Sequence, residues 1–193
     1  VKTSSGYKLV SKAVIAELRQ GRPTAALKML ETDPTAKKLK NSEFDRAKAL
    51  VAQSYLMEGK IDKAAAVAGQ AVLRSGKYVP LAGWVAGQAA WRKGDFRKAA
   101  DMFGISAKSP AASAWLISGS AYWAARSLTR LGKNDEANQW HEVAASYPRT
   151  FYGLISLRTL GRNYDFNWDA PQLDREDRNA LGLDIKVSAA LRL

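Results

Sequence analysis

The chain has no cysteine and one histidine, His141, among its 193 residues. Without cysteine, disulfide bonds, thiolate catalysis and Cys-based metal sites are excluded. A lone histidine beside Trp140 is better explained as a packed or surface side chain than as a ligand or a general base, so neither Ser-His-Asp chemistry nor a His-rich metal site is supported. The sequence therefore predicts no catalytic residue, no metal site and no cofactor.

Long apolar runs and alternating patterns are also missing. No apolar run approaches 18 residues, so no membrane-spanning helix is predicted. No stretch alternates with period two for long enough to indicate a strand. Acidic residues are scarce only in the first half: residues 1–100 hold 19 Lys and Arg against 8 Asp and Glu, whereas the remainder holds 11 against 10, for a formal net charge of +12. A basic face of this kind can attract nucleic acid, an acidic membrane surface or a carboxylate-bearing polymer.

What the sequence does have is a repeat. Gly21, Gly59, Gly94 and Gly132 are spaced by 38, 35 and 38 residues, the length of two helices and a tight turn in a solenoid. Glycine ends a helix in the left-handed conformation at low steric cost. Five residues after each glycine an alanine would let the second helix approach the first, and eight residues after it a larger apolar side chain would fill the layer between pairs. The alanines are Ala26, Ala64, Ala99 and Ala137, and the larger residues are Met29, Val67, Met102 and Trp140.

These patterns predict an all-α fold, a right-handed solenoid or superhelix of stacked antiparallel helix pairs like that of tetratricopeptide repeats. Asp95, the pair Ser42 and Asp45, and Ser109 before Pro110 are expected to mark helix starts. Trp84, Trp91, Trp115 and Trp140 are expected to pack within and between repeats. Helices are predicted at residues 7–20, 24–31, 42–58, 62–74, 79–93, 96–107, 111–131, 135–146, 150–161 and 175 to the end.

Two regions are expected along the chain: a helical-repeat solenoid over residues 1–161, and a connector with the start of a further helical segment over 162–193. The carboxylates of Asp174, Glu176 and Asp177 are better explained as a helix cap and its first turn than as an acid/base pair. The last residues are still apolar at helical spacing at Leu193, whereas a solenoid normally ends in a capping helix with a polar outer face. The expectation is that the polypeptide is a fragment of a longer protein.

One string is more specific than the repeat. It runs through Ala121-Tyr122-Trp123-Ala124-Ala125-Arg126, Leu131-Gly132, Glu136-Ala137 and Tyr147-Pro148-Arg149-Thr150-Phe151-Tyr152-Gly153-Leu154 to Leu160-Gly161. The combination resembles the helical superhelix of the soluble lytic murein transglycosylases, and the Phe166-Asn167-Trp168 connector is similar to theirs. The specific match covers about residues 115–193.

That resemblance implies a periplasmic protein whose helices position peptidoglycan (murein) glycan strands for a separate lysozyme-like module. The family's catalytic Glu-Ser pair and its Gly-Leu-Met-Gln string do not occur here, so the parent would be a glycan-cleaving lyase while this chain alone would be inactive. The resemblance makes Arg126 and Arg149 candidates for binding muropeptide carboxylates, and Trp123 and Tyr152 candidates for stacking on sugar rings. Packing between helix pairs is the competing explanation of these aromatic residues.

Two other functions fit the repeat without the resemblance. A tetratricopeptide-like adaptor would hold a peptide or a partner protein, and the period of 35 to 38 residues suits it well. Other cell-wall proteins are expected as partners, beside murein, only from the resemblance. A helical-repeat RNA binder ranks last, because the charge is uneven and no polar code repeats at fixed positions. No nucleic-acid partner is therefore predicted.

Overall fold

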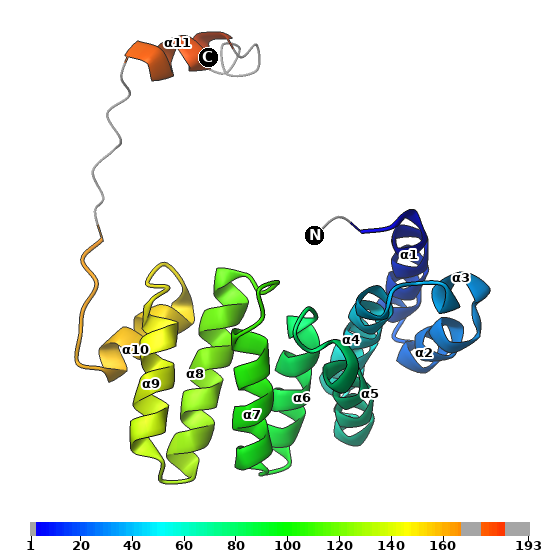
Figure 1. Ribbon diagram of the computed structural model, residues 1–193, viewed down its shortest axis with the longest axis horizontal. Coiled ribbons are helices and arrows are strands. Elements are labelled where there is room, and N and C mark those ends of the chain that lie inside the picture. The colour runs from blue at the N-terminus through cyan, green and yellow to red at the C-terminus, as the bar shows by residue number, and fades with distance from the viewer. Residues whose placement is uncertain (1–2, 167–174, 184–193) are drawn as a thin grey trace.

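The computed structural model describes residues 3–166 and 175–183, and every regular element in these residues is an α-helix. The prediction of an all-α, tetratricopeptide-like helical repeat is confirmed. The helices of the described residues are α1 (Ser5–Arg19), α2 (Pro23–Thr32), α3 (Pro34–Lys37), α4 (Asn41–Met57), α5 (Ile61–Ser75), α6 (Pro80–Arg92), α7 (Phe96–Ala107), α8 (Ala114–Arg130), α9 (Asn134–Ala145), α10 (Phe151–Thr159) and α11 (Arg175–Leu183). Figure 1 shows α1 to α10 following one another as a row of neighbours along the long axis.

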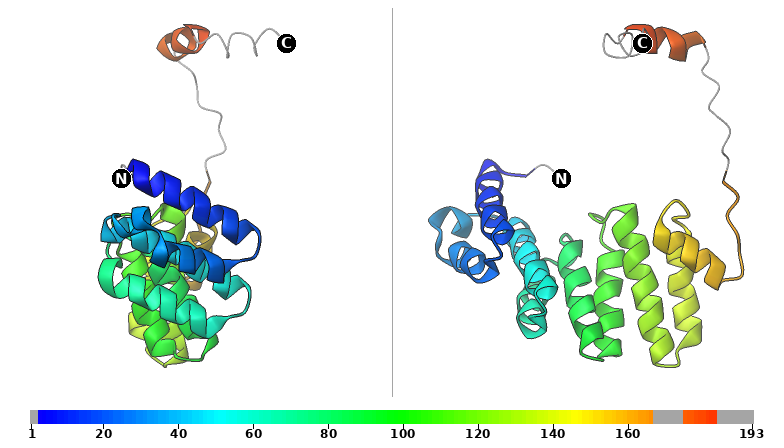
Figure 2. Two further views of the ribbon diagram at one scale, coloured as in Figure 1. Left: turned by 90° about the vertical axis from the view of Figure 1, so that its right-hand side faces the viewer. Right: turned by 180° about the vertical axis from the view of Figure 1, so that it is seen from behind.

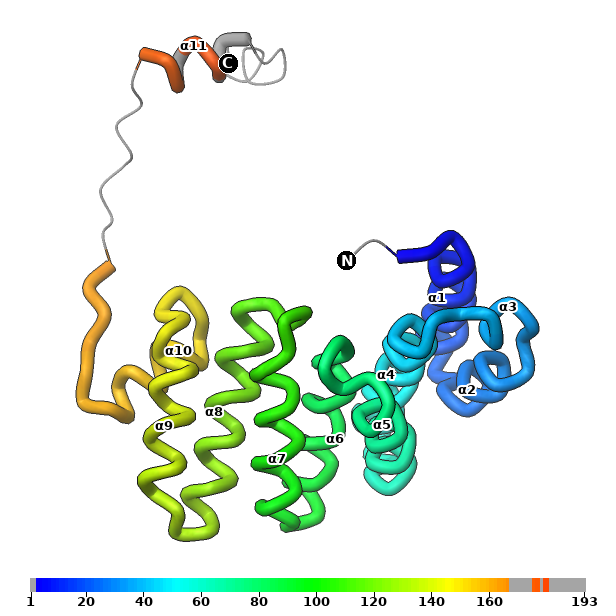
Figure 3. The backbone as a smooth tube through the Cα atoms, viewed as in Figure 1, coloured from blue at the N-terminus to red at the C-terminus, as the bar shows by residue number. Residues whose placement is uncertain are grey.

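Consecutive helices form pairs, and the tube in Figure 3 shows the chain reversing direction from one helix to the next. Helices α1, α4, α6, α8 and α10 are the first members of successive pairs, and we call them the first-helix row. Each first helix contacts the next one in the row as well as at least one adjacent helix along the chain. The row is therefore a continuous surface that crosses every repeat. Figure 2 shows the same stack from one end and from behind.

Glycine turns separate the two helices of each pair, as predicted. Gly21, Gly59, Gly94 and Gly132 have φ between +67° and +77°, and Gly161 repeats the conformation after α10. The residue after each of them donates its backbone N–H to the carbonyl five positions earlier, which satisfies an orphan acceptor at the helix end. An added Cβ at these glycines would meet nothing within 4 Å. Backbone conformation and not crowding therefore requires glycine at these positions.

The small residues predicted after the turns lie in the core. Ala26, Ala64, Ala99 and Ala137 are all fully or almost fully buried. Of the larger residues, Trp140 packs against three separate core clusters, and a Cβ at Gly104 would come within 3.1 Å of its ring. Trp140 thus joins α7, α8 and α9, as expected of a residue that fills the layer between pairs. Trp115 differs from the prediction, because 60% of its surface is exposed.

Three local predictions of helix starts have different outcomes. Asp95 accepts the backbone N–H of Lys98 and caps α7, as expected. Ser109 does not cap a helix: its hydroxyl donates to the carbonyl of Lys77, and α8 begins only at Ala114. The sequence also missed the single turn of α3, which Asp33 caps.

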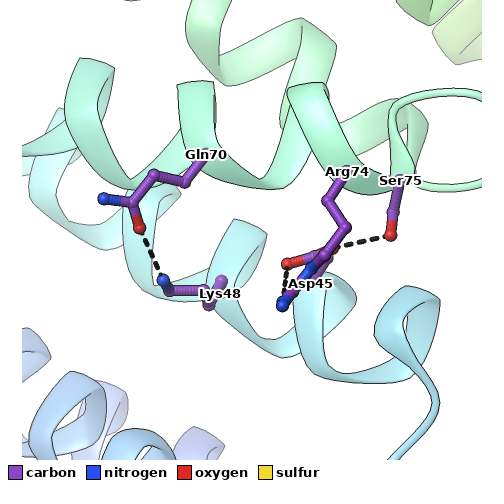
Figure 4. A network of polar contacts seen from close by, with 5 residues as sticks. All are labelled: Asp45, Lys48, Gln70, Arg74 and Ser75. Carbon is purple, nitrogen blue, oxygen red and sulfur yellow. Dashed lines mark hydrogen bonds and ion pairs between the residues drawn. The ribbon is translucent and has the colours of Figure 1, made fainter.

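Asp45 is the third case, since it belongs to a buried ion pair and not to a capping box. Its carboxylate is fully buried and accepts two hydrogen bonds from Arg74, at 2.8 and 2.6 Å, and one from the hydroxyl of Ser75 at 2.6 Å. One turn further along α4, Lys48 donates to the side chain of Gln70 at 2.7 Å. Figure 4 shows both contacts crossing from α4 to α5. Directional polar contacts thus fix how these two helices align.

The proposed division at residue 161 stays a prediction. Residues 162–166 follow α10 without helical structure, and α11 begins at Arg175. The predicted Asn167-Trp168 connector, the cap at Asp174 and the final apolar residues 184–193 lie outside the described residues. Within the described residues, no helix combines the length and the apolar character needed to cross a bilayer.

Candidate functional site

The second half of the first-helix row carries positive charge and no negative charge. Helices α6, α8 and α10 contain four arginines and not one Asp or Glu. In contrast, α9, a second helix, contains three acidic residues and no Lys or Arg. The separation of charge is between these first helices and α9, since the second helix α7 carries Arg97 and Lys98 as well as Asp101. The arginines are Arg92, Arg126, Arg130 and Arg158.

Aromatic side chains connect these same three helices. Ring centroids lie 5.1 Å apart for Trp91 and Trp123, 6.0 Å for Trp123 and Tyr122, 5.2 Å for Tyr122 and Tyr152, and 5.3 Å for Tyr152 and Phe151. We call these five residues the aromatic ladder. Three of the four contacts are edge-to-face, the arrangement that the ring quadrupole favours. The ladder crosses from α6 over α8 to α10.

Gly119 allows the ladder to lie close to the backbone of α8. A Cβ at this position would come 3.1 Å from the ring of Tyr152 and 3.4 Å from the ring of Trp84. The missing side chain therefore lets Trp84 of α6 and Tyr152 of α10 both pack closely against α8 at this position. Substitution by a larger residue would push the rings apart.

Arg126 lies over the ladder. Its guanidinium carbon is 5.0 Å from the ring centroid of Trp123, 5.6 Å from that of Trp91 and 5.9 Å from that of Tyr122, distances that support cation–π attraction. One turn later, Arg130 lies 4.8 Å from the ring centroid of Phe96. Neither arginine forms an ion pair with any acidic residue in the described part of the chain.

A shallow depression of about 160 Å³ lies beside the ladder, lined by Gln88, Trp91, Arg92 and Trp123. The indole Nε1–H of Trp123 is buried and has no hydrogen-bond acceptor among the described residues. Leaving a buried donor unpaired costs about 1–3 kcal/mol. An acceptor supplied from outside the chain would remove this cost.

The structure brings together three of the four predicted site residues. Trp123, Arg126 and Tyr152 belong to one surface, with Trp123 and Tyr152 both touching Tyr122. Arg149 is exposed in the turn between α9 and α10, and no side-chain contact joins it to the ladder. Both Trp123 and Tyr152 are half-buried, so the packing explanation accounts for much of their surface.

Sequence reasoning missed the other members of the surface. The sequence pattern predicts packing alone for Trp91, and it does not single out Arg92, Arg130 or Gln88 as site residues. One signal was available: Trp91, Trp123 and Tyr152 all lie on first helices of successive pairs, and no acidic residue occurs on those helices. Grouping residues by row, and not by position along the chain, would have found it.

His141 is a packed side chain, which is one of the two alternatives expected for it. It is buried, its Nδ1 lies 3.1 Å from the hydroxyl of Ser156, and its ring meets that of Tyr122 at 5.8 Å. Burial lowers the pKa of His141 because the charged imidazolium loses hydration. No group of three or more potential metal-ligating side chains occurs in the part of the chain that the structure describes.

Comparison with known proteins gives a limited result. No family model matches the chain, and no curated protein matches it. Among the solved structures that match, a MamA mutant has 15% sequence identity and a TM-score of 0.49, and the match covers 81% of this chain and 88% of that one. A second MamA structure has 16% identity and a TM-score of 0.48, with coverage of 80% and 87%. MamA has a tetratricopeptide-like helical repeat fold.

These comparisons contradict the resemblance to the soluble lytic murein transglycosylases. Two of the solved structures that match are of MamA, and neither a family model nor a curated protein supports the transglycosylase assignment. The assignment was wrong, because a string of aromatic, glycine and alanine residues at these spacings is also what packing between helical repeats requires. Lytic transglycosylase activity in a parent protein and murein as a ligand are withdrawn with it. The periplasmic location rested on the same resemblance and stays a prediction.

Proposed function

We propose that the protein is a tetratricopeptide-like adaptor that binds a segment of a partner protein along its first-helix row. The observation that carries this proposal is the aromatic ladder with Arg126 above it, a surface shared by three consecutive helix pairs. Helical-repeat proteins bind through extended surfaces of this kind, made by equivalent helices of neighbouring repeats.

The residue types on this surface suit a protein partner. Aromatic residues and arginine are enriched at the centres of protein interfaces, where they contribute most of the binding energy. Phe151, at one end of the ladder, is 58% exposed, and Trp115 on the neighbouring helix α8 is 60% exposed. Both residues lie in the first turn of a first helix, on α10 and α8. Large apolar side chains left in water at one end of the row favour an interaction surface over a purely structural one.

The test uses a random peptide library displayed on phage and selected on the purified chain. Selected peptides are then measured by fluorescence anisotropy against two variants, Phe151→Ser and Leu73→Ser. Both positions hold large exposed apolar side chains, since Leu73 is 90% exposed, but Leu73 lies on the second helix α5. Phe151→Ser removes a contact from the ladder and should weaken peptide binding roughly tenfold, equivalent to about 1.4 kcal/mol. Leu73→Ser should bind the peptides like the unsubstituted protein.

Two results would count against an adaptor acting through this row. One is a selection that yields no peptide with reproducible affinity. The other is equal weakening by both substitutions, which would indicate that the peptides bind through general hydrophobic contact and not through the ladder.

A further inference from the structure

The charge of the first-helix row indicates which partner segment would fit it. On α1 and α4, every acidic side chain already has a partner within the chain: Glu17 pairs with Arg22, Glu43 accepts two hydrogen bonds from Ser4, and Asp45 pairs with Arg74. The row therefore has no carboxylate free to neutralise the arginines of α6, α8 and α10. None of these four arginines forms an ion pair within the described residues, so they are available to anions from outside the chain.

The aromatic rings hold Arg126 in a way that leaves its hydrogen-bond donors available. A guanidinium group attracted to ring faces keeps its N–H groups for other partners, and carboxylate is the anion whose two oxygens match this fork. Arg92 also retains donors, because its one hydrogen bond within the chain runs from Nη1 to the carbonyl of Leu56 at 2.9 Å. Two arginines with spare donors thus flank Trp91 and Trp123.

The depression beside them has the size and chemistry of a site for one side chain. Its volume of about 160 Å³ equals that of about five water molecules at roughly 30 Å³ each, enough for an Asp or Glu side chain. The unpaired Nε1–H of Trp123 requires an acceptor, which a carboxylate supplies. Because Nε1 is covered, side chains next to it must rearrange to admit the acceptor.

We propose that the partner segment is an extended acidic peptide, with one Asp or Glu side chain received between Arg126, Arg92 and the Nε1–H of Trp123. This inference rests on the adaptor function proposed above and specifies the chemistry of its partner. Single-stranded nucleic acid is the competing anion, but it binds such surfaces by stacking bases on open ring faces. In the ladder, Arg126 and edge-to-face neighbours occupy the rings of Trp91 and Trp123.

The experiment measures fluorescein-labelled peptides by anisotropy against the full chain. One twelve-residue peptide alternates Asp or Glu with apolar residues, and its isostere carries Asn and Gln at the same positions. The acidic peptide should bind at least tenfold more tightly than the isostere, and its affinity should fall as salt rises from 50 to 300 mM. Arg126→Gln should remove most of this preference, and Arg126→Lys should restore only part of it, because an ammonium lacks the planar fork.

Arg97→Gln is the matched control. Arg97 is exposed on the second helix α7 and makes no hydrogen bond or ion pair within the described chain, so its loss removes the same charge from the other row. In ¹H–¹⁵N spectra, the Trp123 indole resonance, assigned with Trp123→Phe, should shift downfield on adding the acidic peptide. If Arg126 only stabilises the fold, adding the acidic peptide to the unsubstituted protein should leave its Trp123 indole resonance unchanged.

The outcomes separate the two proposals. Equal binding of the acidic peptide and its isostere overturns the acidic partner, and so does preference for a neutral peptide, although the adaptor function survives either result. Tighter, Arg126-dependent binding of a single-stranded oligonucleotide overturns it in favour of nucleic acid. If neither these peptides nor any library peptide binds, the adaptor function itself fails.

Discussion

The buried pair of Asp45 and Arg74 should respond asymmetrically to removal of its two partners. Arg74→Ala leaves a carboxylate that is 1% exposed with only the Ser75 hydroxyl as a hydrogen-bond donor. Breaking a buried pair in this way costs about 3–5 kcal/mol, because a buried charge is left uncompensated. The Arg74 side chain is 44% exposed, so water can replace part of it. We therefore expect a loss of about 3 kcal/mol in the free energy of unfolding.

Asp45→Ala should cost less, about 1–2 kcal/mol, because the freed Arg74 guanidinium can be hydrated where it stands. The double variant should be no less stable than Arg74→Ala alone, since it also removes the orphaned carboxylate. Asp45→Asn provides a control that keeps the shape of the side chain without its charge. Urea unfolding at pH 7 measures all four variants.

The chain provides two probes that report on different regions. All six tryptophans lie at position 84 or later, so indole emission reports on α6 and beyond, whereas circular dichroism at 222 nm reports on every helix. In a helical array, a local defect weakens its own repeat and the neighbouring interfaces first. In Arg74→Ala, helicity should therefore begin to fall at lower urea than tryptophan emission changes. If Asp45→Ala is the more destabilising substitution, the assignment of the burial cost to the carboxylate is wrong.

The glycines and the histidine yield three further predictions. Gly132→Ala should cost about 1–2 kcal/mol through backbone strain alone, because φ is +72° and the surrounding space is open. Gly87→Ala should cost about 1–3 kcal/mol through overpacking, because its Cβ would lie 2.6 Å from the ring of Phe103. Adding Phe103→Leu should recover stability in the Gly87→Ala variant but not in the Gly132→Ala variant. Burial lowers the pKa of His141, so the folded state resists protonation of the imidazole. The contribution of the neutral imidazole to the free energy of unfolding should be complete above about pH 6.5 and be lost as the pH falls below that value. This loss of stability should be absent in His141→Gln. The single imidazole resonance measures the titration directly.

Much of the fold can be predicted from local sequence signals. The turn glycines and the buried alanines after them are confirmed, because each depends on the residue itself and on its nearest neighbours. The start of α8 was misplaced by the Ser109-Pro110 signal because Ser109 bonds to Lys77, which is distant in sequence. Asp45 was mistaken for a capping residue for the same reason, since its partner is 29 residues away. Tertiary contacts decide such cases, and spacing along the chain does not reveal them.

The candidate site was partly predictable. Trp123, Arg126 and Tyr152 were named from one string, and they do lie together. Trp91 joins them only because α6 packs beside α8, and the orphan indole donor of Trp123 follows from packing that no sequence pattern shows. The chemical meaning given to the string was wrong, because aromatic residues at these spacings serve helix packing whatever the ligand is.

The turn glycines also bear on how the length of such a chain can change. Their left-handed turns project into open space, and each helix pair touches only its neighbours. Duplicating or deleting the segment between two of these glycines, such as residues 95–132, would lengthen or shorten the array by one whole unit without breaking the pattern of stacking. The distance between α10, at one end of the first-helix row, and any feature on α1 or α4 can therefore be changed in steps of one repeat, both by recombination in nature and by design.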